Sequence, residues 1–247
     1  MRSRHPLFTI LLALATPGAA ASAQWPPDSI TNLQVLPKGT PLRELVGTMR
    51  GFASALGVRC IHCHVGDDPN DLASTDFASD DRVQKRKARE MIRMVQTINR
   101  DLLSRVPERA DPPVQVTCTT CHHGVTEPRD VRDLLTATAL ASGADSALAE
   151  YRRLRERFYG SASYDFRPFM LANVAQELLA RAPEAAIRIT EFNLELHPKD
   201  QESYVTLASA HLRRADTTAA IRVMSRAVEQ LPNNPFLEGL LARLRPR

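Results

Sequence analysis

Two five-residue segments of the chain share the pattern C-x-x-C-H, and together they contain all four of its cysteines. On a helical turn, residues three and four apart lie on one face, so each segment would present two thiols and an imidazole together. Two thiols can form thioethers with the vinyl groups of one porphyrin, and the histidine can ligate its iron. The pattern therefore predicts two covalently bound haem c groups, held by Cys60, Cys63 and His64 and by Cys118, Cys121 and His122.

Four cysteines also allow other interpretations. Two disulfides are common in exported chains, and two C-x-x-C pairs could bind zinc. Neither alternative explains why a histidine follows the second cysteine both times, so the haem interpretation is favoured.

The first residues have the features of a secretory signal peptide. A short basic start precedes the apolar run Leu7–Ala15, and the small residues Ala21–Ala23 form a cleavage pattern before Gln24. The apolar run is too short to span a bilayer, and no later segment approaches that length. We therefore expect residues 1–23 to be removed, leaving no transmembrane segment, and the mature protein to reach the periplasm.

The charge of the chain gives no support to nucleic-acid binding. The formal net charge is +4, and removal of residues 1–23 takes away Arg2 and Arg4 but no acidic residue, which lowers it to +2. Haem propionates would lower it further. The basic run 82–93 follows an acidic stretch, which suits either a solvated helix face or a docking patch for an acidic redox partner.

The sequence before the second motif predicts helices and loops, without a convincing strand. A first helix is predicted from Thr40, as N-cap, to a stop at Gly57, and a second over about 80–103. Each carries a methionine on its apolar stripe, Met49 in the first and Met91 in the second. Such methionines usually fill a core, but their sulfur can also be the sixth ligand of a haem iron.

Several of these segments resemble the cytochrome c subunit of photosynthetic reaction centres. Ala88–Met94, followed by Thr97–Asn99, is similar to the helix of that family that carries an iron ligand. Val116–Gly124 is similar to its haem motif, and Leu56–Cys60 to the approach to a haem motif. The resemblance covers roughly residues 32–130 and implies that Met91 and Met49 are iron ligands.

The chain also departs from that family. The family usually carries four haems, whereas this chain has two motifs, and Arg105 stands where the family places a histidine ligand. The chain thus looks like a two-haem half of the family's module. The resemblance leaves open whether it serves photosynthesis, respiration or another redox chain.

The last part of the chain has a different character. Ala185–Arg188 recurs as Ala219–Arg222, and Pro198 recurs as Pro232, both at an offset of 34 residues. This is the tetratricopeptide period, and repeats of that type bind peptides or proteins or support a neighbouring domain. We therefore predict an all-α chain with a dihaem cytochrome c domain over residues 24–135 and a tetratricopeptide-like helical domain over residues 136–247.

These features are compatible with three functions. The first is an electron carrier between periplasmic or membrane redox proteins, with His/Met ligation of both haems. The second is a scaffold or assembly subunit whose repeats hold a protein partner. The third is a dihaem peroxidase, which needs an open iron position that the two methionines would close. The carrier is favoured, and we expect no catalytic residues and no nucleic-acid partner.

Overall fold

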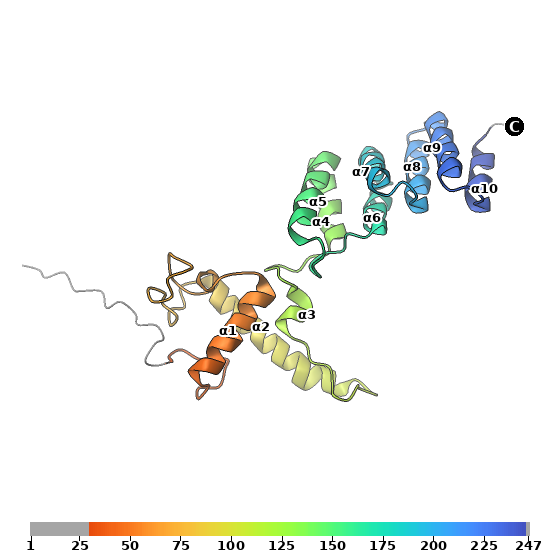
Figure 1. Cartoon of the computed structure of the whole chain (residues 1–247). Helices are drawn as coiled ribbons and strands as arrows, with labels where there is room; N and C mark the ends of the chain where they lie inside the picture. Colours follow the sequence, from red (N-terminus) through yellow and green to blue (C-terminus); the bar gives the residue numbers. More distant parts are fainter. Residues whose placement is uncertain (1–29, 246–247) are drawn as a thin grey trace, which may run out of the picture. The chain divides into compact units, whose positions relative to one another are not determined.

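A computed structural model describes residues 30–245, and within that range the chain is helical (Figure 1). An isolated antiparallel bridge between Val65 and Asp76 is the nearest approach to a strand among these residues. The predicted all-α class is confirmed. The predicted signal peptide lies outside the described residues. The longer helices are α1 Leu42–Leu56, α2 Val83–Thr97, α4 Val131–Ser142, α5 Ala144–Phe158, α6 Pro168–Leu178, α7 Pro183–Leu196, α8 Gln201–Arg213, α9 Thr217–Gln230 and α10 Pro235–Leu244.

Helix α1 ends as predicted but begins differently. Thr40 was expected to cap the helix, but its hydroxyl donates to the Pro37 carbonyl at 2.7 Å. The Pro41 carbonyl instead accepts the first helical bond, from the Leu45 amide at 3.0 Å. At the other end, Gly57 has a φ of +65° and the Val58 amide donates to Ala53 at 3.0 Å, which is a Schellman termination.

The second predicted helix begins slightly later than expected and has an irregular end. The prediction of about 80–103 placed its start too early, because residues 80–82 are not helical and α2 begins at Val83. At its carboxyl end, α2 runs into the π-helical turn Ile98–Leu102 and then the 3₁₀ turn Leu103–Arg105. Wider turns of this kind are frequent at functional sites.

The described chain divides into two compact units. Residues 30–49 and 59–107 form one unit, and residues 50–58 and 108–245 form the other. Over residues 30–245, no helix is both long enough and apolar enough to cross a membrane.

Buried apolar side chains are distributed very unevenly along the chain. Within the described residues 30–130, Ala55 and Val125 are the buried hydrophobic side chains, and all the others lie between Val131 and Leu241. A segment of that length with two elongated helices normally encloses an apolar core of its own. Residues 30–130 therefore lack the internal packing that would hold their helices by protein contacts alone.

Helices α4 to α10 form a regular array (Figure 1). Helix α4 packs on α5, and from α6 to α10 each helix packs on the next; α4 also contacts α6, α5 contacts α7 and α6 contacts α8. Ala186 in α7 and Ala220 in α9 are both completely buried, and each is the fourth residue of its helix. The side chain of Tyr204 is buried too, and its hydroxyl donates to the Pro198 carbonyl at 2.9 Å. The sequence offset of 34 residues thus corresponds to equivalent core positions in successive helix pairs.

Candidate haem sites

The first C-x-x-C-H motif folds into a single helical turn. Residues Cys60–His62 form a 3₁₀ turn, and the amides of Cys63 and His64 both donate to the Cys60 carbonyl, at 3.1 and 3.0 Å. Both cysteines are half-buried free thiols. The turn therefore brings together the two sulfur atoms and the imidazole that the sequence assigned to one haem.

The imidazole of His64 lies in an enclosed and positively charged surrounding. Its Nδ1 atom is buried without a hydrogen-bond partner, and its ring packs against Phe77 with 5.0 Å between centroids. Burial, together with the Lys85 ammonium, lowers the pKa of His64 below its ordinary value. Both effects favour the neutral imidazole, which is the form that ligates iron.

The second motif is the short helix α3, Cys118–His122. A capping box closes its start, in which the Thr117 amide donates to Thr120 Oγ1 at 2.9 Å. His123 ends the helix in the left-handed conformation, with a φ of +46°. Cys118 and Cys121 have free thiols one helical turn apart, as thioether bonds to one porphyrin require.

His122 is oriented by a backbone contact. Its Nδ1 lies 2.9 Å from the Val125 carbonyl oxygen. Because a carbonyl can only accept, Nδ1 is the donor, and in the neutral ring the lone pair therefore lies on Nε2. Histidines that bind metals are typically fixed in this way, with the second ring nitrogen donating to a carbonyl.

The end of α1 packs against the residues that follow the second motif. The Gly124 amide donates to the Ala55 carbonyl at 2.8 Å, and a Cβ at Gly57 would lie only 2.2 Å from the Gly124 carbonyl oxygen. Ser163 also donates to the His123 carbonyl, at 2.5 Å. Sequence reasoning missed Ala55 and Ser163, since small residues in these positions give no chemical signal.

The two methionines that the resemblance implied as ligands lie outside the motif turns. Met49 is half-buried in α1, and Met91 is 40% exposed in α2. Met94, one turn further along α2, is 44% exposed. A methionine that fills a core is buried, so the exposure of Met91 argues against that role.

The residues of both turns fit haem c. The four thiols are free, burial favours the neutral form of His64, the Val125 carbonyl orients His122, and residues 30–130 leave apolar surface uncovered. Large apolar side chains that are at least 40% exposed there are Val83, Met91, Met94, Leu102, Val106 and Val114. A porphyrin is a large apolar group that could replace the missing core.

Comparison with known proteins points in the same direction. Residues 69–170 match the family described as "Photosynthetic reaction centre cytochrome C subunit", and this range contains Met91 and the second motif but not the first. The chain is also 35% identical over 107 residues to cytochrome c-554 of Chloroflexus aurantiacus. That alignment covers 43% of this chain and 23% of the relative, so the chain spans less than a quarter of the length of the protein it matches. Over these residues the chain is thus similar to c-type cytochromes, and its two C-x-x-C-H turns carry the residue types that attach haem c.

Proposed function

We propose that the chain is a dihaem cytochrome that carries electrons between redox partners. The observation that carries this proposal is the hydrogen bond from His122 Nδ1 to the Val125 carbonyl, because it leaves Nε2 free for iron on a turn that also presents two thiols. When bound, haem c supplies one-electron oxidation and reduction at its iron. One haem would be held by Cys60, Cys63 and His64, and the other by Cys118, Cys121 and His122.

The sixth ligands in this proposal are Met49 for one haem and Met91 for the other. Support comes from the exposure of Met91, which leaves its thioether available, and from the resemblance to a ligand-bearing helix. Methionine at the sixth position raises the reduction potential. It also leaves the iron without an open position for a substrate, which favours a carrier over a peroxidase.

The remaining parts of the chain have supporting roles in this proposal. Residues 1–23 act as a signal peptide, so the mature protein works in the periplasm. Residues 24–135 form the haem domain and residues 136–247 form tetratricopeptide-like repeats, supported by the equivalent burial of Ala186 and Ala220. The partners are periplasmic or membrane redox proteins. A scaffold role for the repeats is the second candidate, favoured by their exposed aromatic residues Phe169 and Phe236.

The proposal is tested by a spectroelectrochemical titration of the full chain, produced in a host that attaches haem c and exports it. We expect two low-spin haems at positive potentials. Met91→Leu should convert one of them to a high-spin form with a lower potential, whereas Met94→Leu should leave both unchanged. Met94 is a matched control because it lies on the same helix with a similar exposure. A wild-type haem that is high-spin and binds cyanide quickly would contradict the proposal and favour an enzyme.

A further inference from the structure

The loop that follows the first motif folds back against it. The Asp76 amide donates to the Val65 carbonyl at 2.7 Å, and Thr75 is buried against Gly66. A Cβ at Gly66 would lie 3.0 Å from Thr75 Oγ1, so the two segments are in close contact. The next residue of the loop, Phe77, packs against the His64 ring. The carboxyl end of the loop thus lies beside His64, the expected iron ligand.

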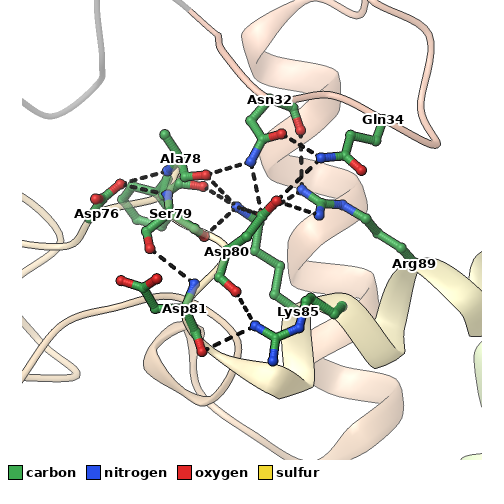
Figure 2. Close-up of polar contacts among 11 residues, drawn as sticks. Asn32, Gln34, Asp76, Ala78, Ser79, Asp80, Asp81, Lys85 and Arg89 are labelled. Atoms are coloured by element: carbon green, nitrogen blue, oxygen red, sulfur yellow. Dashed lines mark hydrogen bonds and ion pairs between the residues drawn. The ribbon is translucent and has the colours of Figure 1, made fainter.

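Two cations of α2 hold that end of the loop (Figure 2). Lys85 Nζ donates to the carbonyls of residues 77, 78 and 79, at 2.9, 3.0 and 2.8 Å. Arg89 donates to both carboxylate oxygens of Asp80, each at 2.8 Å. The Lys85 and Arg89 side chains are only 12% and 10% exposed. Both positive charges are therefore enclosed rather than solvated.

Asp80 is the acidic partner of both cations. One of its oxygens lies 3.3 Å from Lys85 Nζ, in addition to its paired contact with Arg89. Asn32 and Gln34 also donate to its carboxylate, at 2.8 and 3.2 Å (Figure 2). Two cations and one carboxylate leave a net charge of +1 in this cluster.

The cluster lies close to the first motif. Lys85 Nζ is 2.9 Å from the carbonyl oxygen of Phe77, and the Phe77 ring packs against the His64 imidazole with 5.0 Å between centroids. A charge this close to the imidazole also acts on an iron bound to it. Reduction adds one negative charge at the iron, so cations nearby favour the reduced form and carboxylates the oxidised form.

We propose that Asp80 tunes the reduction potential of the haem at the first motif, by neutralising one of the two enclosed cations beside His64. Asp80 is a positioning residue and does not touch the haem ligands. The inference rests on the proposed function, because it requires a haem at Cys60–His64. It goes beyond that function by assigning a control of potential to a charge cluster outside the motif.

The test compares three variants of the full holoprotein by spectroelectrochemical titration. Asp80→Asn leaves both cations uncompensated, so one of the two haems should be reduced about threefold more readily, or about 28 mV higher at 59 mV per tenfold change. Lys85→Gln should shift the same haem in the opposite direction. Asp81→Asn removes the same charge from the next residue, whose carboxylate points away from Lys85 in Figure 2, and should change neither potential.

The opposite signs separate tuning by charge from damage to the fold. If Asp80 served only to hold the loop, both substitutions would loosen it and admit water, and both would shift the potential downward. Shifts of equal sign, or equal effects of Asp80→Asn and Asp81→Asn, would overturn the inference. Failure of the proposed function would look different, since the wild-type protein would then lack one or both covalent haems.

Discussion

The contact between Gly57 and Gly124 gives a prediction whose size follows from the geometry. Gly57 has a φ of +65°, and a Cβ there would meet the Gly124 carbonyl oxygen at 2.2 Å. The left-handed backbone costs about 1–2 kcal/mol for alanine. The clash forces the two backbones apart and breaks the bond from the Gly124 amide to Ala55, which adds about 1 kcal/mol or more. Gly57→Ala should therefore destabilise this contact by about 3 kcal/mol.

Hydrogen exchange followed by mass spectrometry measures this local effect in the holoprotein. A loss of about 3 kcal/mol corresponds to roughly hundredfold faster exchange in the peptide that covers residues 118–125. Gly143→Ala is the matched control, because Gly143 has a φ of +86° but nothing within 4 Å of the added Cβ. It carries the backbone cost without the clash, and exchange over residues 118–125 should not change.

If Gly57→Ala accelerated exchange over residues 118–125 no more than Gly143→Ala does, the close approach of Gly57 to Gly124 would not hold the second motif in place.

Three further predictions concern other parts of the chain. Cys60→Ala combined with Cys63→Ala should remove one haem and reduce the helical circular dichroism, because residues 30–130 have almost no apolar core; an unchanged spectrum would contradict this. Hydrogen bonds from Arg89 hold the pKa of Asp80 far below its usual range. The ionised Asp80 therefore stabilises the folded protein above about pH 4, and this contribution is lost as the pH falls towards the pKa of Asp80 in the folded state. Asp80→Asn should make the free energy of unfolding depend less on pH in the acid range. An unchanged pH dependence would argue against the ion pair of Asp80 with Arg89. Asp200 caps α8, so Asp200→Ala should lower the free energy of unfolding in urea by about 2 kcal/mol, and a change below about 0.5 kcal/mol would exclude the cap as a stabilising feature.

The features predicted from the sequence are those set by local chemistry. The Gly57 stop of α1 follows from the conformational freedom of glycine, and the regular burial of Ala186 and Ala220 follows from the repeat offset. The alternation of helix and loop before each motif follows from apolar periodicity. Each of these depends on residues that are close together in the chain or repeated along it.

The features that the sequence did not predict depend on contacts between distant residues. The early start expected for α2 failed because Lys85 binds carbonyls of the preceding loop, and Asp80 is engaged by Arg89 and Asn32 rather than by the helix amides. The approach of Gly57 to Gly124 was hidden for the same reason. Periodicity and composition describe one segment at a time and carry no information on such partners.

The central claim is that the chain binds two haems covalently, one at each C-x-x-C-H turn. The most direct measurement is the haem content per chain of the purified protein, from intact mass under denaturing conditions together with a pyridine haemochrome spectrum. We expect two haems that remain attached after denaturation, with one lost in the Cys60→Ala and Cys63→Ala variant and one in the Cys118→Ala and Cys121→Ala variant. A mass equal to that of the polypeptide alone, or a single haem that survives both variants, would contradict it.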